Sequence, residues 1–408
     1  MSTSRISRRA LAVLGSLAVS LSALAVVPAP AHADGPGVGT PYVVSVGESY
    51  ISGEAGRWAG NTNQGSYKHD ALGSTAYFDN EAGTGETYQR CHRSRSADIH
   101  IGGVLSKNLA CSGAKTTTYT SDDGYLKPGI DFFDNGSVRG QALDLQNFAK
   151  THNVTMVEVS IGGNDFGFGD TIVACMSNWA TSPSWWKNYC YDDAAVQARV
   201  SSSSVTTRRN EIAQAFANVR AAMRNAGYGD SSWTLLVRNY MSPLPRGAGI
   251  RYAETGYTRY DLGGCGIWNK DADWANDVYL STINSTIDQA RVQSGLTNTR
   301  TLNVATLFNG NRLCETGVGL LEEKGLDTWR SPGAVDQTEW VNTTRVGTTC
   351  CANSPYYIQE SFHPNYWGQL ALRGCVRAAW NGGAVRSGTC VQGASGLTAS
   401  GEPKVVLQ

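Results

Sequence analysis

The sequence is poor in charge. Only 17% of its 408 residues are Asp, Glu, Lys or Arg, and 34 basic residues are balanced by 34 acidic ones. Because such a chain lacks an excess of Lys and Arg to neutralise phosphates, we expect no nucleic-acid partner. Beyond the N-terminus no apolar run is long enough to span a bilayer, and no internal repeat occurs. The 41% hydrophobic content still suffices for a large core, which excludes wholesale disorder.

Metal-binding patterns are also missing. The ten cysteines include no C-x-x-C pair and no Cys/His cluster with zinc-ligand spacing, so we expect neither a metal nor a cofactor. An even number of cysteines in an exported chain indicates disulfides. The sequence leaves the pairing open, with Cys375 and Cys390 unassigned and Cys350 and Cys351 expected to bond to different partners. The local loops that cost least to close join Cys91 to Cys111, Cys175 to Cys190, and Cys265 to Cys314.

The N-terminus has the three parts of a secretory signal peptide. Three arginines within residues 5–9 precede an apolar segment, residues 10–27, and Ala31-His32-Ala33 fits an A-x-A cleavage site. We expect residues 1–33 to be removed and the rest of the chain to be secreted as a monomer without a membrane span. The pair Arg8-Arg9 also fits a twin-arginine signal loosely, so the export route stays open.

Short apolar runs rich in β-branched residues alternate with helical patterns along the chain. The pattern predicts strands at Tyr42–Val46, Thr155–Ile161, Thr234–Arg238 and Arg300–Ala305, and helices at Val205–Asn225, Ala272–Val292 and Asn365–Trp380. Such alternation predicts an α/β domain, residues 34–386, with a parallel sheet covered on both faces. We expect long ordered insertions at residues 52–90 and 309–359. Residues 387–408 are expected to form a loose polar tail held at Cys390.

A serine and a histidine stand where nucleophilic catalysis could use them. Ser49 follows the first expected strand and Gly47, so it can begin a helix whose N–H groups face a developing oxyanion, although most serines in this position are only N-caps. A serine nucleophile needs a base. His363 lies just before a helix, with Glu360 three residues upstream and Pro364 suited to the first helical turn.

Two further segments could supply oxyanion donors. Gly162-Gly163-Asn164-Asp165 follows a strand and places the Asn164 amide at the carboxyl end of the sheet, where ligands of parallel sheets bind. Cys111-Ser112-Gly113-Ala114 presents the N–H of a residue without a side chain in a loop. Each segment alone is also compatible with an ordinary turn.

Taken in order, these segments resemble the four blocks of the SGNH/GDSL hydrolases, most closely the secreted actinobacterial esterases and lipases. The matching blocks are GESY (Gly47–Tyr50), CSGA (Cys111–Ala114), GGND (Gly162–Asp165) and FHPN (Phe362–Asn365). The resemblance implies a flavodoxin-like α/β/α sandwich with a central parallel sheet and long loop insertions.

The same resemblance implies roles for individual residues. Ser49 would be the nucleophile and His363 the base. The Ser49 N–H, the Gly113 N–H and the Asn164 side chain would form the oxyanion hole. Two positions depart from the usual pattern, because Glu48 and Glu360 stand where the family generally has Asp. We expect Glu360 to orient the imidazole, although some secreted relatives use a main-chain carbonyl instead.

Rival catalytic patterns are incomplete. Ser112 and Lys115 match the S-x-x-K of penicillin-recognising enzymes, but no K-T-G follows, and Ile51 interrupts a G-x-S-x-G elbow around Ser49. We therefore expect a secreted serine hydrolase of carboxylic esters, of lipase, esterase or phospholipase type, acting on a small-molecule or lipid ester. The alternatives are a carbohydrate acetylesterase acting on plant or cell-wall polysaccharide and a non-catalytic carbohydrate-binding protein. The tryptophans that suggest binding are Trp58, Trp179, Trp185 and Trp186.

Overall fold

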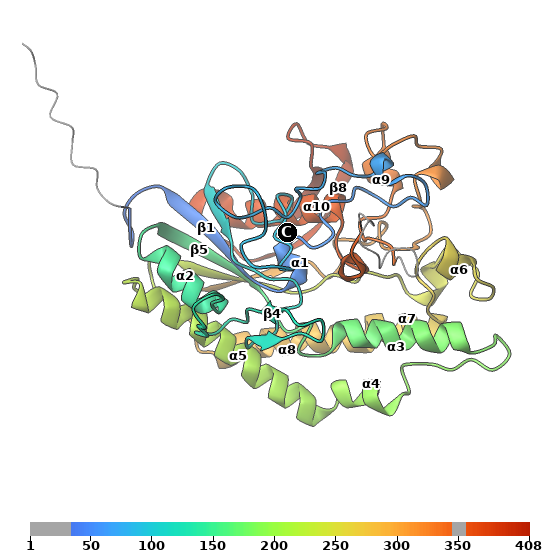
Figure 1. Ribbon diagram of the computed structural model, residues 1–408, viewed down its shortest axis with the longest axis horizontal. Helices are drawn as coiled ribbons and strands as arrows, with labels where there is room; N and C mark the ends of the chain where they lie inside the picture. Colours follow the sequence, from blue (N-terminus) through green and yellow to red (C-terminus); the bar gives the residue numbers. More distant parts are fainter. Residues whose placement is uncertain (1–33, 345–355) are drawn as a thin grey trace, which may run out of the picture. The chain divides into compact units, whose positions relative to one another are not determined.

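The computed structural model describes residues 34–344 and 356–408. Its centre is a seven-stranded sheet with the order β2-β1-β5-β6-β7-β8-β9, in which every neighbouring pair is parallel except β8 and β9 (Figure 1). Its strands are β1 (Pro41–Gly47), β2 (Leu105–Asn108), β5 (Asn153–Ser160), β6 (Thr234–Arg238), β7 (Thr299–Asn303), β8 (Gly388–Leu397) and β9 (Pro403–Leu407). The short strands β3 (Tyr119–Thr120) and β4 (Leu126–Lys127) form a separate pair.

Helices cover both faces of the sheet. The α-helices are α1 (Ser49–Ser52), α2 (Gln141–Ala149), α3 (Phe168–Thr181), α4 (Ala194–Arg199), α5 (Ser202–Asn225), α6 (Thr258–Asp261), α7 (Asn269–Trp274), α8 (Ser281–Gln293), α9 (Ala334–Gln337) and α10 (Tyr366–Trp380). Figure 1 shows α2, α5 and α8 on one side of the sheet and α10 on the other. Within the described residues, no helix combines the length and the apolar character needed to cross a bilayer.

The expected α/β sandwich with a central parallel sheet is confirmed. The predicted strands correspond to β1, β5, β6 and β7, and their apolar residues are buried because helices cover both sides of a parallel sheet. The helix expected from Ala272 consists of α7, one π-helical stretch (Ala275–Leu280) and α8. The residues that define the predicted period of α5 all face the core: Ile212, Phe216, Val219 and Met223.

Residues 387–408 do not form the loose tail that was expected from the sequence. β8 extends the sheet beside β7, and β9 folds back antiparallel to β8. A disulfide joins Cys390 of β8 to Cys375 of α10, and Arg377 of α10 is paired with the buried Glu402. The sequence hides these strands because β8 has few large apolar residues and contributes mostly partly exposed positions.

The disulfides close the short loops that the sequence favoured. The three expected pairings are present, and a fourth joins Cys375 to Cys390. The eight cysteines of the described part are thus all paired with one another, whereas Cys350 and Cys351 lie outside the described residues. The described parts of the expected insertions contain turns and short helices but no strand of the central sheet.

A charge cluster is enclosed in the core between β5 and β6. The Arg238 guanidinium is fully buried and lies 2.9 Å from a Glu158 oxygen and 3.0 Å from an Asp98 oxygen. Two carboxyl groups therefore share one guanidinium. Burial raises the pKa of both carboxyl groups, and repulsion by the negative charge of Asp98 raises the pKa of Glu158 further.

This cluster makes folding stability depend on pH. In the unfolded chain Glu158 has its usual pKa of 4.5. As the pH rises above this value, Glu158 of the unfolded chain loses its proton while Glu158 of the folded chain keeps it, so the free energy of unfolding falls. We expect Glu158→Gln, which cannot ionise, to make this fall shallower. Urea unfolding of both proteins between about pH 5 and pH 9 measures it. Equal slopes for the two proteins would contradict the raised pKa.

Candidate active site

The chain turns sharply where β1 ends. Gly47 has a φ of 144°, and a Cβ at this position would lie 2.0 Å from the Ser160 carbonyl oxygen, so only glycine fits. The turn leads into α1, whose first residue is Ser49 and whose N-cap is Glu48. Ser49 is therefore held at the carboxyl end of the central strands, 3% exposed.

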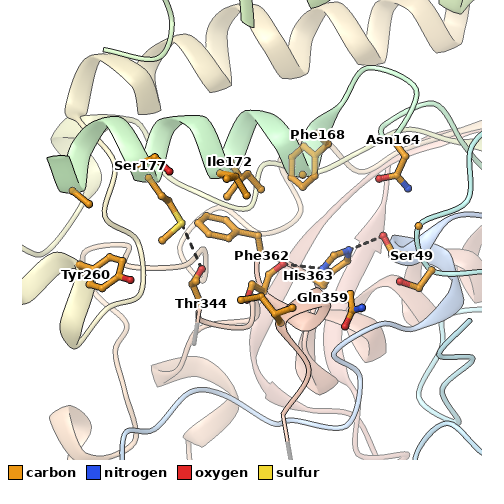
Figure 2. Close-up of a pocket in the computed structure, with 18 residues that line it drawn as sticks. Ser49, Asn164, Phe168, Ile172, Ser177, Tyr260, Thr344, Gln359, Phe362 and His363 are labelled. Atoms are coloured by element: carbon orange, nitrogen blue, oxygen red, sulfur yellow. Dashed lines mark hydrogen bonds between the residues drawn. The ribbon is translucent and has the colours of Figure 1, made fainter. Parts of the chain in front are cut away.

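His363 meets Ser49 from the far end of the sequence. Its Nε2 lies 2.6 Å from Ser49 Oγ, and its Nδ1 lies 2.9 Å from the main-chain oxygen of Ser361 (Figure 2). Phe362, between them, has a φ of 62°, an uncommon conformation for a residue with a side chain. The Tyr50 hydroxyl donates to the Phe362 carbonyl at 2.7 Å and so ties this strained turn to α1.

A short backbone ladder fixes the same turn from the other side. The Phe362 N–H donates to the Asn342 carbonyl, and the Asn342 N–H donates to the His363 carbonyl at 2.8 Å. The Asn342 side chain also donates to the Glu360 carbonyl. The imidazole is thus positioned by main-chain contacts on both flanks.

The acceptor on Nδ1 determines the tautomer of His363. A carbonyl oxygen can only accept, so Nδ1 carries the hydrogen and the neutral ring offers Nε2 as an acceptor for the Ser49 hydroxyl. Burial lowers the pKa of His363 below its usual 6.5, which keeps the ring neutral near pH 7. The pair can therefore move a proton from Ser49 Oγ to His363 Nε2.

Glu48 is a second neighbour of the Ser49 hydroxyl. Its Oε2 lies 2.9 Å from Ser49 Oγ, while its Oε1 accepts from the Tyr50 N–H. The hydroxyl has a single hydrogen, so at any one time it donates either to Glu48 Oε2 or to the neutral His363 Nε2. Burial raises the pKa of Glu48 to about 7, against the lowering effect of the hydrogen bonds from Ser49 and Tyr50.

The loop that carries Gly113 lies beside Ser49. The Cys91–Cys111 disulfide and a bond from the Cys111 N–H to the Gly47 carbonyl, 3.1 Å, hold this loop against the end of β1. Gly113 has a φ of 79° and lines the cavity next to Ser49. No acceptor within the described residues is bonded to the N–H of Ser49 or of Gly113, so both can donate to a bound oxyanion.

Asn164 completes the group of cavity-lining polar residues that the sequence predicted. Figure 2 shows it beside Ser49. Its side-chain nitrogen donates to the Ala114 carbonyl at 3.0 Å and to Glu48 at 3.3 Å. The first bond fixes the amide against the loop of Gly113, and the longer second bond leaves one hydrogen that can turn to a ligand.

The sequence led us to expect that Glu360 orients His363, but its carboxylate does not contact the imidazole. The carboxylate accepts from the Trp58 indole at 2.8 Å, from the Tyr77 hydroxyl and from the Tyr357 N–H. It is fully buried, and burial raises its pKa to about 7. The extra length that makes Glu differ from Asp carries the group toward Trp58 and Tyr77, and the Ser361 carbonyl takes its place on the ring.

A buried ion pair near the site was not anticipated from the sequence. Glu54 and His92 are 2.8 Å apart and both almost fully buried. Burial alone would raise the pKa of Glu54, but the partner imidazole holds it at about 2. The ionised Glu54 also raises the pKa of His363, against the larger effect of burial. The partner His92 acts in the opposite direction and lowers the pKa of His363.

An apolar cavity of about 440 Å³ opens beside Ser49 and runs along α3. Four side chains of α3 line it at intervals of four residues: Phe168, Ile172, Met176 and Ala180. Figure 2 shows Phe168 near the Ser49 end of the cavity and Ser177 and Tyr260 toward the other end. Phe362 and Ile358 line the cavity as well. The four-residue interval is the sequence signal from which this helix could have been predicted.

Possible metal ligands gather at one place in the described residues, where Cys175, Cys190 and Asp271 approach one another. The two cysteines form a disulfide, so their sulfur atoms are not thiolates. This group lacks the donors of a metal site.

Comparisons with known proteins give only distant likenesses. No protein-family model and no curated protein sequence matches the chain. Among solved structures, an extracellular lipase from Streptomyces rimosus is 19% identical, with a TM-score of 0.41, over 81% of this chain and 95% of the lipase. Phospholipase A1 from Streptomyces albidoflavus NA297 is 18% identical, with the same TM-score and coverage.

A third structure is more distant still. A family two carbohydrate esterase from Clostridium thermocellum is 10% identical, with a TM-score of 0.36, over 84% of this chain and 63% of that esterase. Likenesses at this level do not decide an activity, which must be argued from the site itself.

The environment of His363 can be tested by its titration. We expect its NMR-determined pKa to lie below 6.5, because burial disfavours the charged ring. Glu360→Gln should leave this pKa almost unchanged, since the carboxylate is bonded to Trp58 and Tyr77. A His363→Asn variant identifies the resonance. A fall of the His363 pKa by more than about one unit in Glu360→Gln would show instead that this carboxylate contacts the imidazole.

Proposed function

We propose that this protein is a serine hydrolase of carboxylic esters, of the SGNH/GDSL type, in which a main-chain carbonyl takes the place of the third catalytic residue. The observation that carries the proposal is the continuous path from Ser49 Oγ through both nitrogens of His363 to the Ser361 carbonyl. A nucleophile bonded to a base, and a base held by a third group, is the arrangement that activates a hydroxyl for acyl transfer.

The first half of the reaction forms an acyl-enzyme. Ser49 Oγ attacks the ester carbonyl carbon while His363 Nε2 takes the hydroxyl proton, and the Ser361 carbonyl stabilises the resulting imidazolium through Nδ1–H. The N–H groups of Ser49 and Gly113 and the Asn164 amide donate to the oxyanion. His363 then gives its proton to the leaving alcohol.

The second half repeats these steps with water. His363 removes a proton from a water molecule, the hydroxide attacks the acyl carbon, and the same donors stabilise the second oxyanion. Breakdown of this intermediate returns the proton to Ser49 Oγ and releases the acid. No step needs a metal or an organic cofactor.

The cavity supports an apolar acyl group as the bound part of the substrate. The stripe of α3 from Phe168 to Ala180 covers thirteen residues, a rise of roughly 18 Å along the helix, and begins beside Ser49. An acetyl group would contact only the start of this stripe. Each further methylene that enters the cavity contributes about 0.8 kcal/mol. We therefore propose esters of medium or long acyl chains as substrates.

We further propose that the protein acts outside the cytoplasm. The four disulfides of the described part support this location, since such bonds persist in oxidising compartments. The signal-like pattern of residues 1–33 in the sequence supports export.

Replacement of the nucleophile tests the reaction. Ser49→Ala should lower kcat for p-nitrophenyl butyrate by at least about 10³-fold, because no other group is placed to attack. Thermal unfolding of the same preparation should remain close to that of the parent, since only a hydroxyl is removed. Turnover within about tenfold of the parent by folded Ser49→Ala protein would refute the assignment.

Obstruction of the cavity tests the acyl group. Met176 lies midway along the α3 stripe, so Met176→Trp should reduce kcat/KM for p-nitrophenyl decanoate at least about tenfold, which corresponds to the loss of two buried methylenes. The acetate ester does not reach this point, and its hydrolysis by the same variant serves as the matched control. A parent enzyme that prefers acetate to every longer ester would instead favour a carbohydrate acetylesterase.

A further inference from the structure

The loop between α3 and α4 exposes two adjacent tryptophans. Trp185 is 84% exposed and Trp186 is 74% exposed. The other nine of the eleven tryptophans lie in the described part of the chain as well, and all of them are buried or half-buried. Among the described residues, no aromatic ring packs against Trp185 or Trp186. The exposure of these two indoles is thus exceptional among the tryptophans of the described part.

The loop is fixed at its base rather than loosely attached. The Cys175–Cys190 disulfide ties its end to α3, and Lys187 forms a 2.5 Å ion pair with Glu254. Within the loop, the Trp186 N–H donates to the Pro183 carbonyl at 2.9 Å. Because these contacts hold the loop in one shape, the two indoles are presented to solvent by a fixed turn.

An apolar surface that could cover these indoles lies close by. Trp179, in the last turn of α3, stacks on Tyr260 and packs near Trp268, and Lys187 lies over the Trp268 ring. Trp185 and Trp186 do not join this cluster. Apolar neighbours are therefore present near the loop, and the two indoles remain exposed beside them.

The loop begins where the proposed acyl cavity ends. Ala180 lines the cavity at its end away from Ser49, and α3 finishes one residue later at Thr181. Tyr257, 66% exposed, contacts Trp179 on the same side of the helix end. Figure 1 shows the α3–α4 loop projecting beyond α3 at the right of the view, with α6 above it. The exposed aromatic residues therefore gather at the remote end of the cavity.

We propose that Trp185 and Trp186 anchor the protein to a lipid–water interface and so bring the cavity along α3 to aggregated ester substrates. This proposal rests on the proposed function, because the anchored loop would face the lipid surface from which an apolar acyl chain enters the cavity. Tryptophan suits this role because its large apolar ring carries one N–H donor and favours the boundary between lipid and water.

A polysaccharide surface fits these observations less well. A sugar chain stacks on exposed rings that share a plane, and among the described residues no ring contact pairs Trp185 with Trp186. An apolar cavity also runs along α3 from Ala180, just before the loop, toward Ser49, whereas a polysaccharide would need polar side chains along its path.

Vesicle binding tests the anchor without turnover. In a Ser49→Ala background, the double variant Trp185→Ser/Trp186→Ser should lower the partition coefficient onto phosphatidylcholine vesicles at least about tenfold in co-sedimentation, given the area that each indole can bury. The matched control is Tyr67→Ser, which removes an aromatic ring that is 74% exposed in a different loop. This control should bind as the parent does. Equal binding by the double variant and the parent would overturn the proposal.

Activity measurements separate this proposal from the proposed function. With Ser49 intact, the double variant should hydrolyse soluble p-nitrophenyl butyrate within about twofold of the parent, but an emulsified long-chain ester at least about fivefold more slowly. Equal loss on both substrates would overturn the anchor, as would loss of pull-down by insoluble xylan with unchanged vesicle binding. A parent that hydrolyses neither ester would refute the proposed function, whereas the vesicle result from the Ser49→Ala background would still stand.

Discussion

The hydrogen bond between Ser49 Oγ and His363 Nε2 joins residues that are 314 positions apart, and much of the surrounding structure serves to maintain it. On one side, β1 must end in a glycine turn so that α1 can begin with Ser49. On the other side, the strained turn at Phe362 must be held by Asn342 and Tyr50. Since Tyr50 belongs to α1, its hydrogen bond to Phe362 connects the two halves of the site a second time, close to Ser49 and His363.

The carboxyl groups around this bond differ in their charge because their partners differ. Glu48 and Glu360 are buried without a cation in contact, and burial raises the pKa of each to about 7. Glu54 is equally buried, but its contact with His92 keeps it ionised. Of these three carboxyl groups, the one that stays ionised well below neutral pH is therefore Glu54, which contacts His92.

The fold was predictable where the sequence is periodic and apolar. β6 lies where the apolar run predicts it, and α5 begins three residues before its expected start. β8 could not be predicted in the same way, because its Gly, Ser and Thr residues depend on pairing with β7 and β9 rather than on a buried face. Ser49 and His363 were identified by short motifs, and the structure brings them together. The pairing of Glu54 with His92 links two irregular segments, for which no periodic pattern exists.

The acceptor on His363 Nδ1 has a consequence for how this site tolerates change over evolutionary time. A carbonyl oxygen is present at residue 361 whatever its side chain, so substitution there does not delete the group that holds the imidazole. The feature that has to be conserved is the path of the backbone. Tyr50 and Asn342, which are distant in the sequence, enforce this path through their contacts. Sequence drift around the histidine is therefore constrained by conformation rather than by the chemical identity of a neighbouring acid.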